Sequence, residues 1–161
     1  MSFTPDRRNE QYDTFFDPST GLPTEPLLLD RIDIAIRRAR RIGKTALIVQ
    51  LEVDIANGDE TLARAVALQL SSALRTDDTI ARISPNEFVV VCNDLATEDE
   101  IHLILERLID SLHRPLAVAG RPAQLVSRIG VVFGDSTHDP KELLENARRA
   151  MLADDRTPLT S

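Results

Sequence analysis

The chain has 161 residues, of which 42% are hydrophobic and 28% charged, as expected of one soluble domain with a hydrophobic core. Its formal net charge of −7 argues against a nucleic-acid backbone as the main partner. No apolar run has the length of a membrane span, and the polar start MSFTPDRRNE is not a signal peptide. We therefore expect a cytoplasmic protein without membrane insertion. The single Cys92 excludes a disulfide framework and is expected to be a core thiol.

The first part of the chain predicts a polar leader, a helix, a strand and a second helix. Residues 1–16 are polar and aperiodic, and DPSTGLP (17–23) is rich in turn formers. Apolar side chains then recur at helical spacing up to Gly43, which can end the helix. TALIVQLEV (45–53) has the composition of a buried strand, and ANGDE (56–60) leads into the second helix.

The remaining elements complete a recognisable order. They are a tight hairpin of strands 79–83 and 87–92, a third helix after Thr97, a small hairpin near Gly120, a strand containing SRIGVVF, and a last helix from Asp139 to about Ala153. Without the first helix, the small hairpin and the last helix, the order is β-α-β-β-α-β. This order predicts a ferredoxin-like α+β sandwich, in which helices pack mainly on one face of an antiparallel sheet.

The tight hairpin has an unusual turn. Two-residue hairpin turns favour residues with positive φ, which Pro85 cannot adopt. With Ser84 in the first position and Pro85 in the second, the residues suit a type I turn.

Four segments, in register, resemble the GGDEF domain, the diguanylate cyclase module that condenses two GTP molecules into cyclic di-GMP. They are DPSTGLP (17–23), LRTDDTIARISPNEFVVV (74–91), SRIGVVF (127–133) and ELLENARRAML (142–152). The resemblance covers about residues 17–156, with 1–16 as a leader and 157–161 as a tail. It implies a nucleotide-cyclase-like fold: the ferredoxin-like core with an extra N-terminal helix, a small hairpin and a C-terminal helix.

The same resemblance indicates a degenerate catalytic site. The signature G-G-D-E-F aligns with Ser84, Pro85, Asn86, Glu87 and Phe88. Pro85 replaces a glycine that lets the backbone approach GTP, and the neutral Asn86 replaces a metal-binding carboxylate. Glu52 aligns with the family's other metal ligand but has a longer arm, and Mg²⁺ tolerates little geometric error.

Two further parts of the family's nucleotide site lack counterparts. Most of the segment whose Asn and Asp recognise guanine is missing between Asp54 and the second helix. The positions of a Lys and an Arg that hold the triphosphate align with Asp155 and about Leu159, which reverses the local charge. We therefore expect no metal, no cofactor and no synthesis of cyclic di-GMP.

One binding motif of the family is retained. Its inhibitory R-x-x-D motif matches Arg75 and Asp78, with five residues between Asp78 and Ser84. An arginine can contact guanine O6 and N7 together, a contact worth about 1–3 kcal/mol, and an aspartate can accept from the N1 and N2 hydrogens. A further arginine from a second subunit often joins this site, and Arg107 is a possible match. An ordinary i,i+3 surface ion pair explains Arg75 and Asp78 equally well.

Two functions remain open from the sequence. The first is a non-catalytic effector that binds cyclic di-GMP through Arg75, Asp78 and Arg107 and acts on a protein partner. The second is a protein-interaction or dimerisation module that regulates a partner without any nucleotide. Residual turnover of GTP is a third and weaker hypothesis.

Overall fold

A computed structural model describes residues 15–56, 58–113, 126–134 and 139–154, and the structural statements below concern these residues. The small hairpin expected near Gly120 lies outside the described residues, as do Asp155, Leu159 and most of the expected leader.

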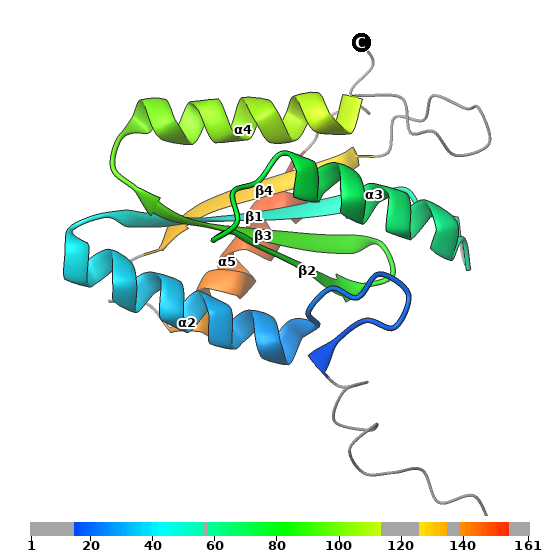
Figure 1. Cartoon of the computed structure of the whole chain (residues 1–161), viewed down its shortest axis with the longest axis horizontal. Helices are drawn as coiled ribbons and strands as arrows, with labels where there is room; N and C mark the ends of the chain where they lie inside the picture. Colours follow the sequence, from blue (N-terminus) through cyan, green and yellow to red (C-terminus); the bar gives the residue numbers. More distant parts are fainter. Residues whose placement is uncertain (1–14, 57, 114–125, 135–138, 155–161) are drawn as a thin grey trace, which may run out of the picture.

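Four antiparallel strands form the central sheet, in the order β2-β3-β1-β4 (Figure 1). The strands are β1 (Thr45–Val53), β2 (Thr79–Ser84), β3 (Glu87–Leu95) and β4 (Val126–Gly134). The order along the chain confirms the predicted ferredoxin-like core, since β1 lies in the centre of the sheet between β3 and β4.

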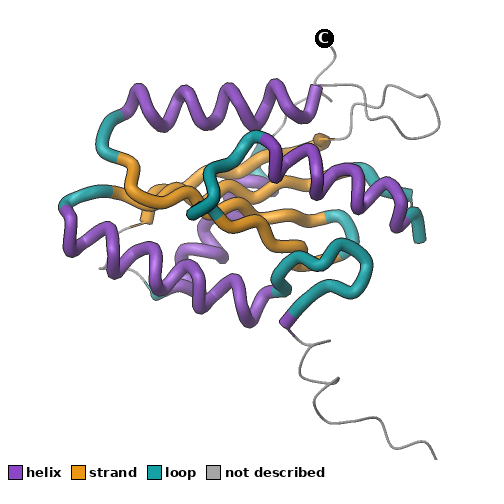
Figure 2. The backbone as a smooth tube through the Cα atoms, in the orientation of Figure 1, coloured by secondary structure: helices purple, strands orange, loops and turns teal. Residues whose placement is uncertain are grey.

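Helices cover both faces of this sheet (Figure 2). The helices are α2 (Glu25–Ile42), α3 (Glu60–Ser72), α4 (Glu98–His113) and α5 (Pro140–Leu152). The core pair α3 and α4 lies on one face, as predicted, but α2 and α5 lie on the other. The prediction of helices mainly on one face concerned the core without the first and last helices and is confirmed there, whereas these two added helices cover the other face. None of these described helices is long and apolar enough to cross a membrane.

The sequence of β1 explains why both faces are covered. Leu47, Val49 and Leu51 point into the apolar cluster beneath α3 and α4. Ala46 and Ile48 point into the second cluster, beneath α2 and α5. Because alternate side chains of a strand lie on opposite faces, an apolar run without alternation must be buried on both sides.

Local sequence signals set the helix ends as predicted. Gly43 ends α2 with φ of 68°, a left-handed conformation that glycine adopts without strain. The carboxylate of Asp139 caps α5 by accepting from the Lys141 N–H at 3.0 Å. Before α4, Thr97 Oγ1 accepts from the Glu100 N–H at 3.2 Å.

Helix α5 packs directly on the backbone of β4. A Cβ atom on Gly130 would overlap the carbonyl oxygen of Ala147 and the backbone nitrogen of Met151. Just past the helix end, the Asp154 carboxylate accepts from the Ile129 N–H at 2.9 Å. This close approach holds α5 against the face of the sheet, over its edge strand β4.

Arg82 on β2 joins segments that are far apart in the sequence. Its side chain is only 6% exposed, and its Nη1 donates to Asp17 Oδ2 at 3.0 Å and to Glu60 Oε2 at 2.9 Å. Its Nη2 donates to the Pro85 carbonyl at 2.9 Å, and the guanidinium carbon lies 5.9 Å from the centre of the Phe88 ring. A buried cation requires such partners, and here they come from the leading turn, α3 and the hairpin.

The turn DPSTGLP (17–23) presents Asp17 to Arg82. Asp17 Oδ2 also accepts from Thr20 Oγ1 at 2.6 Å, and the Pro23 carbonyl accepts from the Arg82 N–H at 2.9 Å. Burial raises the pKa of the Asp17 carboxyl, but the hydrogen bonds from Thr20 and Arg82 outweigh it and hold the pKa below its usual value.

Replacing Arg82 with glutamine is expected to make the protein less stable in a pH-dependent way. Because the pKa of Asp17 is lower in the folded state, its contribution is fully present above the unfolded value near 3.8 and is lost as pH falls through the folded value. We expect Arg82→Gln to lower the free energy of unfolding by roughly 1.5–3 kcal/mol at pH 7 and by less at pH 3. Urea denaturation at both pH values measures this difference.

The matched control for this substitution is Arg37→Gln. Arg37 pairs with Asp33 on the exposed face of α2, with 75% of the arginine side chain exposed, so its loss should cost less than about 1 kcal/mol. A difference between wild type and Arg82→Gln that is equal at pH 7 and pH 3 would contradict the role assigned to Asp17.

Gly130→Ala is expected to be the more damaging of two glycine substitutions on β4. The added methyl group meets the backbone of α5, so we expect a loss of about 3 kcal/mol in the free energy of unfolding. Gly134→Ala is the control, because its nearest neighbours are the movable methyl groups of Ile36 and Leu143 at 3.0 and 3.1 Å. Equal losses in urea denaturation would show that α5 does not lie this close to β4.

Candidate functional site

The hairpin between β2 and β3 turns through Pro85 and Asn86, with Ser84 and Glu87 paired across it. Neither turn residue has a positive φ, which excludes type II and both primed turns and agrees with the expected type I turn. The pairing register shifts between Arg82 and Ser84, an irregularity that adjusts the twist of the strands next to the turn.

The backbone of this turn is hydrogen-bonded to its surroundings. The Pro85 carbonyl accepts from the guanidinium of Arg82, and the Asn86 carbonyl accepts from the Val53 N–H at 2.8 Å. The side chains of Pro85 and Asn86 are exposed. The turn is therefore fixed at the end of β1, where Glu52 lies.

The side chain of Arg128 binds the carboxylate of Glu52, the residue that the resemblance aligns with a metal ligand. Glu87, Glu52 and Arg128 occupy directly opposed positions on β3, β1 and β4. Arg128 Nη2 donates to Glu52 Oε2 at 2.8 Å, and its Nε donates to Oε1 at 3.2 Å, so both carboxylate oxygens are engaged. These hydrogen bonds raise the pKa of the Arg128 guanidinium.

The sequence did not identify Arg128 as part of the site. The available signal was an arginine in an otherwise apolar strand segment, but its partner is set by the register of β4 on β1. Across the part of the chain that the structure describes, no three His, Cys, Asp or Glu side chains are grouped so that they could hold a metal ion.

Asp78 of the R-x-x-D motif is used inside the fold. Its side chain is 2% exposed, and its two oxygens accept from the backbone N–H groups of Arg75 at 3.0 Å and Asn93 at 3.2 Å. The Arg75 Nε lies 3.7 Å from Asp78 Oδ2, so the i,i+3 ion pair of ordinary surface structure is present. A direct contact of Asp78 with guanine would have to reach the remaining lone pairs of two oxygens that are almost fully buried.

Arg75 is 51% exposed and lines a cleft between the end of α3 and α4. Its Nη2 donates to the Asn93 carbonyl at 2.6 Å, which holds the side chain against β3. The cleft has a volume of about 300 Å³ and is also lined by Arg107, Asp110 and Ser111. The structure thus brings Arg75 and Arg107 to one cleft within a single chain.

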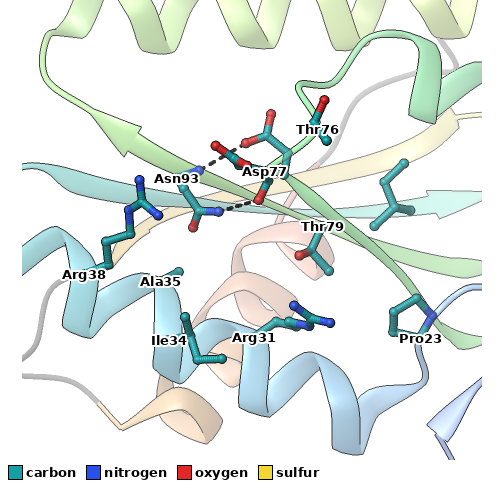
Figure 3. A pocket seen from close by; sticks show the side chains of 11 residues that line it. Pro23, Arg31, Ile34, Ala35, Arg38, Thr76, Asp77, Thr79 and Asn93 are labelled. Atoms are coloured by element: carbon teal, nitrogen blue, oxygen red, sulfur yellow. Dashed lines mark hydrogen bonds between the residues drawn. The ribbon is translucent and has the colours of Figure 1, made fainter.

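Asp78 lines a different cleft, between β2 and α2 (Figure 3). This cleft has a volume of about 500 Å³, and Arg31 and Arg38 of α2 line its wall. Arg38 Nη2 pairs with Asp94 Oδ2 at 2.9 Å. The two residues of the motif therefore lie between two clefts, each lined by arginines.

Cys92 lies beneath this region and is fully buried. Burial raises the pKa of its thiol to about 12, and the nearby carboxylate of Asp78 adds to this effect. The expectation of a core thiol is confirmed.

Comparison with known proteins agrees with this fold. Residues 14–157 match the family model described as diguanylate cyclase, GGDEF domain. The chain is 27% identical over 147 residues to the cyclic di-GMP phosphodiesterase NbdA and 29% identical over 146 residues to the diguanylate cyclase DgcP, both from Pseudomonas aeruginosa. These alignments cover 84% of the chain but only 18% and 22% of the relatives, so the chain spans about a fifth of their length.

Among solved structures, a sensory box/GGDEF family protein from Caulobacter crescentus has a TM-score of 0.74 and 25% sequence identity, over 86% of this chain and 96% of that one. The strand order, the segments around the hairpin and the match to the family model lead to one conclusion: the chain belongs to the GGDEF-domain family of cyclic di-GMP signalling.

Proposed function

We propose that this chain is a non-catalytic GGDEF domain that binds cyclic di-GMP as an effector. The relatives named above act in the synthesis and breakdown of this dinucleotide, which makes it the first ligand to consider. The single observation that carries the proposal is a contrast between two places in the fold. The metal position is bound by Arg128, whereas Arg75 faces a cleft together with a second arginine.

The ion pair of Glu52 with Arg128 supports the loss of catalysis. Mg²⁺ requires oxygen ligands in a near-ideal octahedron, and it would have to displace a guanidinium that already engages both oxygens of Glu52. Asn86 offers no negative charge in compensation. An arginine in the same chain also keeps its positive charge at every physiological pH, so the carboxylate is neutralised without a metal.

The geometry of the turn adds a second obstacle to GTP. Pro85 has no backbone N–H to donate to a phosphate, and its carbonyl already accepts from Arg82. The Asn86 carbonyl is likewise engaged by β1. The turn thus offers few groups to a nucleotide that carries several negative charges.

The cleft between α3 and α4 has the side chains that a guanine needs. The guanidinium groups of Arg75 and Arg107 can each donate two parallel hydrogen bonds to O6 and N7, and they also attract the phosphates of the ligand. Asp110 lines the same cleft and can accept from N1 and N2. We assign Asp78 a positioning role, because it holds the backbone and the guanidinium of Arg75.

Calorimetric titration of the whole chain with cyclic di-GMP tests this proposal. We expect binding by the wild type and a loss of about five- to 150-fold in affinity for Arg75→Ala and for Arg107→Ala, the equivalent of one bidentate guanine contact. Asp110→Asn should weaken binding as well. Both arginines are exposed, so these variants should fold.

The control is Arg64→Ala, which removes an exposed arginine near the start of α3, away from the cleft at its other end. Its affinity should equal that of the wild type. No heat at high micromolar cyclic di-GMP would reject the effector and favour a protein-interaction module. Wild-type affinity in both Arg75→Ala and Arg107→Ala would reject this cleft as the site.

A further inference from the structure

Gln50 is a buried polar residue that the site described above does not use. It lies in the middle of the central strand β1 and is fully buried, yet neither Oε1 nor Nε2 has a hydrogen-bond partner among the described residues. An unpaired buried amide destabilises a fold, and an apolar side chain of similar shape would avoid that cost. A ligand that supplies hydrogen-bond partners to Oε1 and Nε2 would explain why a glutamine occupies this buried position.

The Gln50 side chain lines a cleft of about 620 Å³, within the range of small-molecule sites. Its lining residues place the cleft on the face of the sheet that α2 and α5 cover, whereas the cleft of Arg75 and Arg107 lies on the face of α3 and α4. It is bounded by the start of α2, by the β2–β3 hairpin and by α5. Ile83 and Leu144 give it apolar walls, and the exposed Lys141 and Arg148 of α5 lie along it.

The chemistry of these groups selects a class of ligand. A glutamine amide presents a donor beside an acceptor in one plane and can pair with the matching edge of a nucleobase, as in the bidentate contact of glutamine with adenine. Ile83 and Leu144 suit the apolar faces of a flat ring, and Lys141 and Arg148 suit a phosphate.

The acidic residues of the cleft limit the charge of the ligand. Glu25, Glu87 and Glu145 also line it, although Glu145 already pairs with Arg149 at 3.2 Å. A triphosphate would meet more repulsion here than a monophosphate would.

We propose that this cleft binds a nucleoside monophosphate, with the base edge on the Gln50 amide and the phosphate near Lys141 and Arg148. The glutamine amide can form two hydrogen bonds with N6 and N7 of adenine, so AMP is the probe. This site is independent of the cyclic di-GMP site proposed above, because the two clefts lie on opposite faces of the sheet.

Titration of the full chain with AMP, followed by NMR or calorimetry, tests the site. We expect the wild type to bind AMP. The affinity should be about five- to 150-fold lower in Gln50→Leu, which replaces the amide with an apolar side chain of similar size. Arg148→Ala should weaken AMP binding without weakening adenosine binding. Ribose 5-phosphate, which lacks the base, should bind no better to the wild type than to Gln50→Leu.

Urea denaturation checks that Gln50→Leu is folded, and we expect it to be at least as stable as the wild type. Arg64→Ala, on the opposite face, should bind AMP normally. The proposal is overturned if the wild type fails to bind AMP at millimolar concentration, or if Gln50→Leu binds it as the wild type does. Cyclic di-GMP titration of Gln50→Leu should give wild-type affinity, which separates the failure of this site from the failure of the effector function.

Discussion

Arg82 is the side chain on which the arrangement of the β2–β3 hairpin and its neighbouring segments depends. Its buried guanidinium connects the leading turn through Asp17, helix α3 through Glu60 and the hairpin through the Pro85 carbonyl. These groups come from three separate parts of the sequence, so one cation sets their mutual positions. Because a buried cation is costly unless it is paired, the three segments and Arg82 stabilise one another.

Next to this hairpin lies the carboxylate that the resemblance aligns with a metal ligand, and in this chain its positively charged partner is an arginine. Glu52 lies at the end of β1. The Nε and Nη2 of Arg128, on the neighbouring strand β4, donate to its two carboxylate oxygens. A metal ion would have to be recruited from solution, whereas Arg128 is held in place by the strand pairing itself. Function depends on particular side chains rather than on the fold, so membership of the family does not by itself assign catalysis to this chain.

Much of the fold was predictable because its signals are local. Gly43 and Asp139 mark helix ends by their own conformation and hydrogen bonding, and the strand order follows from the alternation of elements. The contact of Arg128 with Glu52 was not predictable, since it depends on the register between strands 76 residues apart. The burial of Asp78 also depends on strand pairing, because one of its oxygens accepts from the N–H of Asn93 on β3, across the hairpin.

The most direct test of the central claim is incubation of the chain with GTP and Mg²⁺, followed by chromatography of the products. We expect GTP to be recovered unchanged, with neither cyclic di-GMP nor GDP formed. The reasons are the ion pair at Glu52, the neutral Asn86 and the hydrogen-bonded backbone of the turn. A turnover of GTP that disappears in Glu52→Ala would contradict the account, because it would show that this carboxylate still supports catalysis despite its pairing with Arg128.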